Sequence, residues 1–347
     1  MLPTKGYAAT HAGAVLEPYN FDRRSVGTHD VLIKISHCGI CHSDIHQARD
    51  EWGGSIFPMV PGHEIVGTAT QVGNAVTGFR EGDSVGVGCL VDTCRTCQSC
   101  QQGLEQYCQE NLVFTYNGRD KHGEPTLGGY STQIVVDERY VFRIPSSLTP
   151  EGAAPLLCAG ITTYSPLKHW GVGKGHKLGV LGLGGLGHMA VKIGHAMGAE
   201  VTVLSRSESK RSDAERLGAK DFALLNSQET VTALAGQFDF IIDTVSAPHD
   251  YSIVLEMLKT DGTLILVGAP DKPTPMGSFP LVMRRRRMVG SLIGGIPETQ
   301  EMLDFCAEHG IVSDVEVISI QEVNKAYERI LKGDVRFRFV IEMASLA

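Results

Sequence analysis

The stretch GLGGLG at residues 182–187 constrains the fold of this chain more than any other feature. It follows an apolar run, residues 177–181, and opens an apolar-periodic stretch that continues to residue 197. A glycine-rich turn from a strand into a helix is typical of the βαβ units that bind dinucleotides, because its glycines allow a tight turn and a close approach of the backbone to a pyrophosphate. The N–H groups at the start of the helix then face the phosphates. A glycine-rich turn without a ligand is the alternative.

The chain around this turn alternates between strand-like and helix-like segments. Helices are expected at 155–167, 184–197, 210–217 and 251–258, and strands at 177–181, 200–204, 222–225, 238–244 and 263–267. Alternation at this spacing predicts βαβ units and a parallel sheet. A further helix is expected at 297–309, followed by strands at 313–320 and 337–341. Four consecutive arginines, residues 284–287, predict a solvated loop or helix face.

The first half of the chain has a different pattern, in which short Val- and Ile-rich runs are separated by turn residues. Strands are expected at 31–35, 64–69, 84–87, 134–136 and 140–142, which together predict a compact β-barrel-like domain. We therefore expect a two-domain α/β protein. A β-rich domain spans 1–153, a doubly wound parallel sheet spans 154–296, and a C-terminal segment spans 297–347.

Composition limits the partners and the compartment. The 347 residues are enough for about two domains that bury their own cores. The net charge is −8 and no half is basic, so neither nucleic acid nor an anionic membrane surface is an expected partner. No apolar run reaches the ~18 residues of a membrane span, and the N-terminus lacks the apolar core of a signal peptide. Nine cysteines without an export signal predict reduced thiols in the cytoplasm.

Four of these cysteines, Cys94, Cys97, Cys100 and Cys108, lie within fifteen residues. Four thiolates at this spacing can complete a tetrahedral zinc shell with no open position. An iron–sulfur site of the bacterial type would need a three-residue final spacing and a following proline, and both are absent. Free core thiols are the other alternative, which the polar residues between the cysteines disfavour. The sequence therefore predicts a structural zinc.

The residues after the second strand of the βαβ unit decide between the two nicotinamide cofactors. No acid ends the strand at Ser205 to hold a ribose hydroxyl pair, and the spacing from Ser205 to Glu208 fits a helix capping box instead. Ser205, Arg206, Ser207 and Lys210 form a cationic, hydroxyl-rich group that suits a 2′-phosphate. The chemistry favours NADP over NAD.

Three further residues, Cys41, His63 and Cys158, are scattered, and each alone is more typical of a core position than of a ligand. Their surroundings change this interpretation. The pattern GHE-x2-G-x5-G at 62–73, the pattern CHSD-x-H at 41–46, the four-cysteine group and the glycine fingerprint resemble the zinc-containing medium-chain alcohol dehydrogenases over nearly the whole chain. Shorter stretches at 39–46, 158–162 and 290–294 resemble the cinnamyl alcohol dehydrogenase branch, which includes microbial NADPH-dependent aldehyde reductases.

The resemblance implies a GroES-like catalytic domain, a Rossmann domain and a C-terminus that returns to the catalytic domain. It implies two zinc ions per chain, one structural and one catalytic, the latter held by Cys41, His63 and Cys158 with a fourth position open, the ligand set known for alcohol dehydrogenases. Asp44 would accept a hydrogen bond from the second ring nitrogen of His63. The further catalytic residues implied are Ser43 and His46, as a proton relay, and Glu64, as an acid beside the zinc with a plain ion-paired carboxylate as the alternative.

The cofactor and substrate contacts are also implied residue by residue. Cofactor contacts are expected from Thr162, Gly182, Gly184, Gly185, Leu186, Gly187, Ser205, Arg206, Ser207, Lys210, Thr244, Val267, Gly268, Ser291 and Ile293. Substrate-pocket candidates are Gln47, Trp52, Cys89 and Leu292, and a surface aromatic is the alternative for Trp52. Plant members place a tryptophan five residues after the last lobe cysteine, where this chain has Val113. A broad range of aromatic and medium-chain aliphatic aldehydes is therefore expected.

These expectations combine into a zinc-dependent, NADP-preferring alcohol dehydrogenase that acts mainly as an aldehyde reductase, with a small-molecule substrate and, by resemblance, a homodimeric state. An NAD-dependent alcohol oxidiser is the first alternative. A zinc-free quinone reductase would not need both cysteine sets. A non-catalytic NADP-binding module with structural zinc only is the alternative from another functional class.

Overall fold

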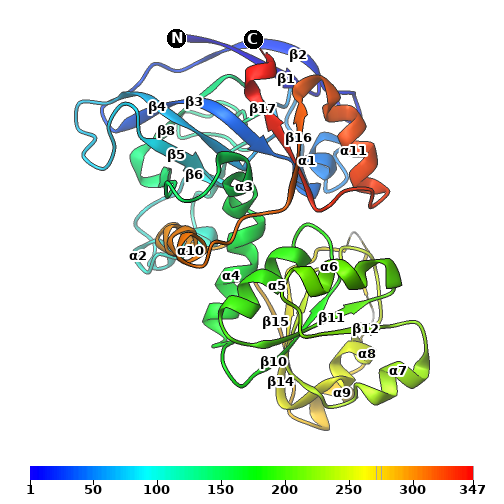
Figure 1. Cartoon of the computed structure of the whole chain (residues 1–347). Coiled ribbons are helices and arrows are strands. Elements are labelled where there is room, and N and C mark those ends of the chain that lie inside the picture. Colours follow the sequence, from blue (N-terminus) through cyan, green and yellow to red (C-terminus); the bar gives the residue numbers. More distant parts are fainter. Residues whose placement is uncertain (271, 275, 347) are drawn as a thin grey trace. The chain divides into compact units, whose positions relative to one another are not determined.

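The computed structural model describes residues 1–270, 272–274 and 276–346, and the chain divides into two compact units (Figure 1). Unit 1 comprises Met1–Ile161 and Gly294–Ala347, and unit 2 comprises Thr162–Ile293. The C-terminal segment thus belongs to the same unit as the N-terminal half. The first division falls inside helix α4 (Ala159–His169), whereas the sequence predicted domain boundaries at 153/154 and 296/297.

Unit 2 is built on a fully parallel six-stranded sheet in the order β12-β11-β10-β13-β14-β15. The strands are β10 (Lys177–Leu181), β11 (Glu200–Ser205), β12 (Asp221–Leu224), β13 (Phe238–Asp243), β14 (Leu258–Leu266) and β15 (Arg287–Gly290). The two central strands, β10 and β13, are buried along almost their whole length, as expected of strands that are covered on both faces. Strand order reverses between β10 and β13, and such a switch point is where doubly wound sheets bind their ligands.

The helices of unit 2 are short and connect successive strands. They are α5 (Gly187–Ala196), η4 (Glu208–Lys210), α6 (Arg211–Arg216), α7 (Gln228–Ala233), α8 (Tyr251–Glu256) and α9 (Phe279–Val282). Helix α5 packs on β10 and β11, and α8 packs on β14 around a core that includes Leu255, Leu258 and Leu264. The prediction for the arginine run is wrong for Arg286, which is buried and donates to three backbone carbonyls.

Unit 1 contains a seven-stranded sheet with the path β16-β17-β3-β4-β5-β9, and β8 pairs with β3 beside it. These strands are β3 (Asp30–Gly39), β4 (Ile65–Val72), β5 (Ser84–Val87), β8 (Gln133–Asp137), β9 (Phe142–Arg143), β16 (Val315–Ser319) and β17 (Arg338–Glu342). Two hairpin-like pairs complete it: β1 (Leu2–Ala8) with β2 (Glu17–Arg23), and β6 (Leu90–Asp92) with β7 (Val113–Phe114). Strand β17 pairs with β3, so the C-terminal segment completes the sheet of the N-terminal half.

The helices of unit 1 include the ones that carry the candidate site. They are α1 (His42–Ala48), α2 (Gln98–Gln101), η1 (Glu105–Tyr107), η2 (Glu138–Tyr140), α3 (Pro150–Ala153), η3 (Ala154–Leu157), α10 (Ile296–Glu308), η5 (Ile320–Glu322), α11 (Val323–Leu331) and η6 (Met343–Leu346). The helix expected over 155–167 is interrupted at Cys158, where η3 ends and α4 begins. Tyr140, expected in a strand, lies in η2.

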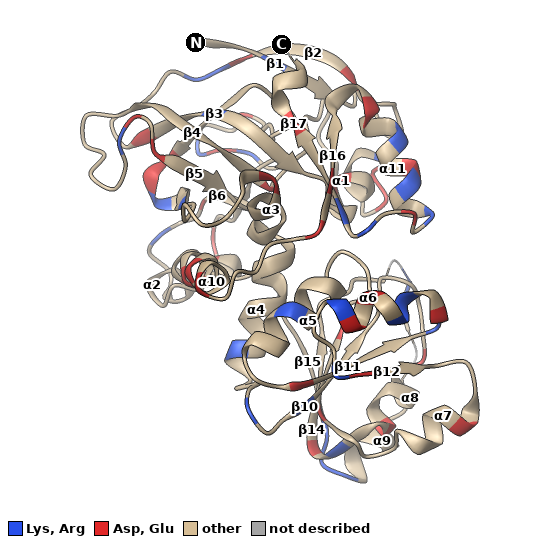
Figure 2. Cartoon of the chain, viewed as in Figure 1, with Lys and Arg blue, Asp and Glu red and all other residues tan. Residues whose placement is uncertain are grey.

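Acidic and basic residues are mixed along α6 and α11 (Figure 2). On α6, for example, Arg216 pairs with Asp213 one turn away. Such mixed charge is typical of ordinary solvated helices. None of the helices in the described part of the chain is long and apolar enough to cross a membrane.

Candidate active site and metal centres

Four potential metal ligands converge in unit 1 from segments far apart in the chain. Cys41 directly precedes α1, His63 and Glu64 precede β4, and Cys158 lies between η3 and α4. One donor atom of each residue lies within 4.8 Å of those of the other three, and all four residues are buried. The Sγ atoms of Cys41 and Cys158 are 3.9 Å apart, although 117 positions separate the two residues. The structure therefore brings together the three residues that the sequence assigned to a catalytic metal.

The chemistry of this donor set fits a zinc ion. Two thiols and an imidazole are ligands that zinc favours. A hydrogen bond from the Cys158 thiol, assisted by His63, holds the pKa of the Cys41 thiol well below its usual range. The same hydrogen bond is the first reason why the pKa of Cys158 is raised. One of the two sulfurs is thus poised to be a thiolate, the form that binds metal, and a cation would stabilise the second.

Asp44 orients His63 from behind. Its Oδ1 lies 3.4 Å from His63 Nδ1 and accepts a hydrogen bond from the Gly62 N–H at 3.1 Å. Its Oδ2 accepts from the Cys41 N–H at 2.8 Å and from the Tyr130 hydroxyl at 3.1 Å. A carboxylate beside Nδ1 keeps the proton on that nitrogen and leaves Nε2 free to bind a metal. The fully buried Tyr130 is a member of this network that the sequence did not indicate.

Glu64 is completely buried, and one of its oxygens is ion-paired with Arg338 of β17. The other oxygen, Oε2, has no hydrogen-bond partner among the described residues. Burial raises the pKa of the Glu64 carboxyl to about 7, against the opposing charge of Arg338. The Glu64 side chain therefore has both features that the sequence offered as alternatives. It lies beside the candidate metal ligands, and it is ion-paired with Arg338.

Ser43 and His46, the two residues expected to relay protons, both lie on α1. The Ser43 hydroxyl is 3.6 Å from Cys41 Sγ and so borders the ligand cluster. Nδ1 of His46 pairs with the Glu51 carboxylate, and the His46 ring stacks on Trp52 with centroids 4.8 Å apart. Trp52 is 45% exposed and Glu51 is partly exposed, whereas the His46 side chain between them is mostly covered. Sequence reasoning missed Glu51, although it stands five positions after His46.

The other substrate-pocket candidates lie in both units. The Gln47 side-chain oxygen accepts a hydrogen bond from the Asn117 amide, so Asn117, which the sequence did not single out, fixes this side chain. Cys89 lies beside the ligand cluster, and a hydrogen bond with Cys158 is the first reason why the pKa of its thiol is lowered. Leu292 belongs to unit 2, where it is 45% exposed. The pocket roles of all these residues stay predictions.

The second metal group is a lobe formed by residues 92–113 of unit 1. The donor atoms of Cys94, Cys97, Cys100 and Cys108 lie within 4.8 Å of one another. Backbone N–H groups point at two of the sulfurs, from Cys94 to Cys108 Sγ at 3.4 Å and from Cys97 to Cys94 Sγ at 3.3 Å. Such donors stabilise thiolates. Four cysteine sulfurs can complete a tetrahedral shell and leave no position open, as in a structural zinc site.

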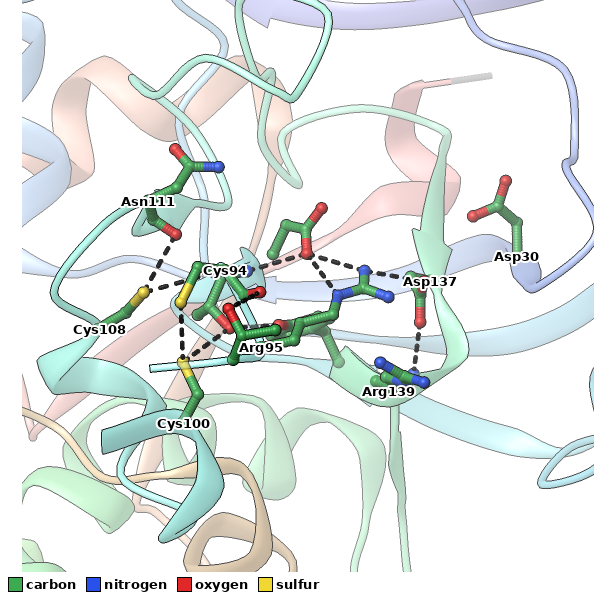
Figure 3. A network of polar contacts seen from close by, with 12 residues as sticks. Asp30, Cys94, Arg95, Cys100, Cys108, Asn111, Asp137 and Arg139 are labelled. Atoms are coloured by element: carbon green, nitrogen blue, oxygen red, sulfur yellow. Dashed lines mark hydrogen bonds and ion pairs between the residues drawn. The ribbon is translucent and has the colours of Figure 1, made fainter. Parts of the chain in front are cut away.

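Arg95 fastens this lobe to the neighbouring sheet (Figure 3). Its guanidinium pairs with Asp92 at 2.8 Å and with Asp137, the last residue of β8, at 2.9 Å. It also lies over the Tyr140 ring, 5.6 Å from the centroid, and the Tyr140 hydroxyl is 2.7 Å from Thr93 Oγ1. The cysteine lobe is thereby tied to the sheet through polar contacts made by residues that flank its first cysteine.

The glycine fingerprint forms the turn from β10 into α5. Gly182 has a φ of +88°, in the left-handed region that favours glycine, and a Cβ on Gly187 would collide with the Gly182 carbonyl oxygen. A Cβ on Gly184 would meet nothing within 4 Å, so this face of the turn is open. Gly185 and Leu186 follow, half-buried, just before the helix. An open turn at a helix N-terminus is suited to receive phosphates.

The segment after β11 holds the expected adenosine-phosphate contacts. Ser205 is buried at the strand end, and its hydroxyl accepts a hydrogen bond from the Ser207 N–H at 3.1 Å. The side chains of Arg206 and Ser207 are exposed, and Lys210 is half-buried at the end of η4. The four expected contacts thus provide two cationic groups and two hydroxyl groups at the end of β11 and in the turn that follows it.

The capping box expected between Ser205 and Glu208 is absent. The Ser205 hydroxyl bonds within its own turn, to Ser207. The Glu208 carboxylate pairs instead with Arg211, three residues further on. An arginine one turn away is a stronger partner for a carboxylate than a backbone N–H, which explains the outcome.

The remaining expected cofactor contacts follow the carboxyl ends of other strands. They are Thr244 after β13, Val267 and Gly268 after β14, and Ser291 and Ile293 after β15. Because all six strands are parallel, these residues share one edge of the sheet with the fingerprint. The Thr244 hydroxyl donates to the Leu181 carbonyl at 2.8 Å and ties its loop to the end of β10. Thr162 is buried on α4.

Two sequence families match the chain over most of its length. "Alcohol dehydrogenase GroES-like domain" matches residues 27–146, and "Zinc-binding dehydrogenase" matches residues 185–308. The chain belongs to the zinc-binding alcohol dehydrogenase family. It is therefore an oxidoreductase, and the expected fold, a GroES-like domain with a Rossmann sheet, is confirmed.

Individual members of the family are similar over the full chain. NADP-dependent alcohol dehydrogenase C 1 of Mycolicibacterium smegmatis is 56% identical over 100% of this chain and 99% of its own. Aldehyde reductase YahK of Escherichia coli is 53% identical over 99% of each chain. The structure of the Helicobacter pylori cinnamyl alcohol dehydrogenase complexed with NADP(H) superposes with a TM-score of 0.93 at 45% identity, covering 99% of each chain. The resemblance to the cinnamyl alcohol dehydrogenase branch is confirmed.

Proposed function

We propose that this chain is a zinc-dependent alcohol dehydrogenase that transfers hydride between NADP(H) and primary alcohols or aldehydes, mainly as an aldehyde reductase. The convergence of Cys41, His63 and Cys158, with Asp44 behind the imidazole, carries the proposal. The names of the two relatives, one NADP-dependent and one an aldehyde reductase, agree with it. Aromatic and medium-chain aliphatic aldehydes are the proposed substrates, because Val113 provides a smaller side chain than the tryptophan of plant members.

Each group of side chains has a role in this proposal. The three convergent ligands would hold a catalytic zinc, and the four lobe cysteines would hold a structural one. When bound, zinc would polarise the substrate carbonyl and NADPH would supply the hydride. The Ser43 hydroxyl, which borders Cys41, would give a proton to the substrate oxygen. His46, half-buried on α1 and paired with the more exposed Glu51, would exchange protons with solvent.

The direct test is aldehyde-dependent oxidation of NADPH beside NADH by the purified chain, with benzaldehyde and hexanal as substrates and zinc content measured in parallel. We expect rapid use of NADPH, little use of NADH and two zinc ions per chain. Activity with NADH alone would show that the enzyme uses NADH and that the proposed cofactor is wrong. A chain that holds two zinc ions and binds NADPH but turns over neither cofactor would be a binding module.

Arg206→Ala is expected to weaken NADPH binding about tenfold or more while NADH binding changes less than about twofold. The reason is that the exposed guanidinium stands among the hydroxyls after β11, where only NADPH would place a phosphate. The dissociation constants for NADPH and NADH are measured by nicotinamide fluorescence. Arg216→Ala removes an arginine that pairs with Asp213 on α6 and serves as the control. Equal losses for the two cofactors would refute the phosphate contact.

We infer a homodimer formed through unit 2. Strand β15 is one of the two outer strands of the parallel sheet, and the preceding α9 exposes Phe279 by 75% and Val282 by 74%. Apolar side chains this exposed beside a sheet edge favour burial against a second copy of the same surface. Val282→Asp is expected to shift sedimentation from dimer to monomer, whereas Val317→Asp, at an exposed valine of β16, leaves the dimer intact. An unmutated chain that sediments as a monomer would contradict the proposal.

We also propose that the enzyme acts in the cytoplasm. None of the nine cysteines, all of which the structure describes, is in a disulfide, and six of them belong to the two candidate zinc groups. Zinc binding by these groups needs thiols that a reducing compartment protects. Cell fractionation tests this directly.

A further inference from the structure

His249, in the loop after β13, lies between two hydrogen-bond acceptors. Its Nε2 is 2.8 Å from Oδ2 of Asp243, which is buried at the end of the strand. Its Nδ1 is 2.9 Å from the Ala247 carbonyl oxygen. A carboxylate and a carbonyl can only accept, so both ring nitrogens must carry protons and the ring is an imidazolium. The hydrogen bond to Asp243 accordingly raises the pKa of His249 above its usual value.

The charged and titratable groups around this ring come from three elements. Asp243 ends β13 and Arg206 follows β11, and these parallel strands lie on either side of β10, so His249 and Arg206 lie at the same end of the sheet. The positive charge of Arg206 opposes the rise in the His249 pKa. The Tyr251 phenol of α8 meets the ring edge-on, with centroids 4.9 Å apart. Asp250, the next residue, accepts a hydrogen bond from the Ser252 N–H. The His249 imidazolium therefore compensates the buried Asp243 carboxylate, and Arg206 adds a positive charge at the same end of the sheet.

We propose that His249 is a specificity-determining residue, whose positive charge offsets the buried Asp243 carboxylate and so helps the Arg206 group to select a dinucleotide that bears a phosphate on its adenosine ribose. The inference rests on the proposed use of NADP(H). A 2′-phosphate adds about two negative charges at neutral pH, so an imidazolium that compensates the Asp243 carboxylate stabilises NADPH more than NADH. Both donors of His249 are already used within the loop, so it acts through its charge rather than by a hydrogen bond to the ligand.

A purely structural role is the competing explanation. Asp243 also accepts a hydrogen bond from the Val245 N–H at 3.0 Å, and Val245 packs against Gly182 and Gly268, two expected cofactor contacts. If His249 only fixed this loop, its loss would weaken NADPH and NADH equally. The two roles therefore differ in the ratio of the two affinities and in its pH dependence.

The test uses His249→Gln, whose amide can still donate to Asp243 but carries no charge. Dissociation constants for NADPH and NADH are measured by nicotinamide fluorescence on the full chain without aldehyde. We expect NADPH to bind roughly three- to tenfold more weakly and NADH to change less than about twofold. His249→Lys, which restores the charge, is expected to recover most of the preference. Equal changes for both cofactors, or an unchanged preference in folded His249→Gln, would overturn the proposal.

The pH profile gives a second readout. As the pH rises through the raised pKa of His249, the imidazolium is lost, so the NADPH affinity of the unmutated chain falls while that of NADH stays constant. The range is pH 6.5 to 9, above the phosphate's own titration near pH 6. His249→Gln is expected to flatten the profile, and His249→Lys to shift the fall above pH 9. If the unmutated chain shows no preference for NADPH, both this inference and the proposed cofactor are wrong; a preference that survives His249→Gln contradicts this inference alone.

Discussion

Replacing Cys158 by serine is expected to lower turnover of benzaldehyde by about a thousandfold or more, while NADPH still binds. Serine keeps the shape of the side chain but cannot supply a thiolate, so the candidate zinc site loses one of its sulfur ligands. The Cys41 thiolate also loses the thiol of Cys158 as its hydrogen-bond partner. A catalytic zinc contributes several kcal/mol of transition-state stabilisation, which corresponds to a loss of this size. Steady-state kinetics, zinc content and NADPH affinity measure the three consequences separately.

Cys306→Ser is the matched control for this substitution. Cys306 is also fully buried in unit 1, on α10, where its sulfur lies 3.6 Å from the Met302 sulfur and far along the chain from either zinc group. It is expected to lose some stability but to keep two zinc ions and turnover per folded molecule. Full activity of Cys158→Ser, or a parallel loss of NADPH binding, would show that Cys158 is not a ligand of the reacting centre.

The position of Cys158 also shows where sequence patterns stop being informative. The apolar periodicity predicts one helix over 155–167, because residues such as Leu156, Leu157 and Ile161 are buried whether or not the helix is continuous. The chain instead leaves helical geometry at Cys158, with φ −129° and ψ −68°. This one-residue break separates η3 from α4 at the thiol that lies beside Cys41. Only the family resemblance, and not the pattern itself, pointed to a ligand at this position.

Local motifs were predictable from the sequence and long-range partners were not. The cysteine lobe and the glycine turn are encoded within about fifteen residues each, so their spacing alone constrains them. The partners that tune the site, Tyr130 for Asp44 and Arg338 for Glu64, stand 86 and 274 positions away. No spacing rule links such residues, because the sheet pairing of β17 with β3 brings in the C-terminal segment.

The arginine run illustrates the same limit. Arg285 is exposed and pairs with Asp261, as a solvated segment predicts. Arg286, its chemically identical neighbour, is buried and donates to the carbonyl oxygens of Glu256, Leu258 and Pro280. Glu256 is the last residue of α8 and Pro280 lies in the four-residue α9, where the final carbonyl groups have no helical partner, and Leu258 begins β14. A charge pattern cannot tell which of four arginines meets those carbonyls.

Replacing Cys97 by serine is expected to have the largest effect on stability. The lobe contains only four-residue α2, three-residue η1 and two short strands, too little buried apolar surface to hold its shape without a metal. Glu105 of the lobe accepts a hydrogen bond from the Ile296 N–H at 2.9 Å, so a loosened lobe also frees the start of α10. We expect zinc to fall from two ions to one per chain and the unfolding midpoint to fall by about 10 °C or more.

Thr96→Ser, at the exposed neighbour of the same turn, is the control and should retain both zinc ions and the unfolding midpoint. Hydrogen exchange locates the damage: Cys97→Ser should lose protection across residues 92–113 and at the start of α10, whereas the parallel sheet of unit 2 keeps its protection. The Arg95 pairs with Asp92 and Asp137 remain available in the variant, but exposed or half-exposed ion pairs contribute at most about 1 kcal/mol each and cannot replace a metal. The prediction is contradicted if the variant keeps two zinc ions or has the same unfolding midpoint as the unmutated chain. The polar contacts would then be enough to fold the lobe, and its cysteines would not be structural zinc ligands.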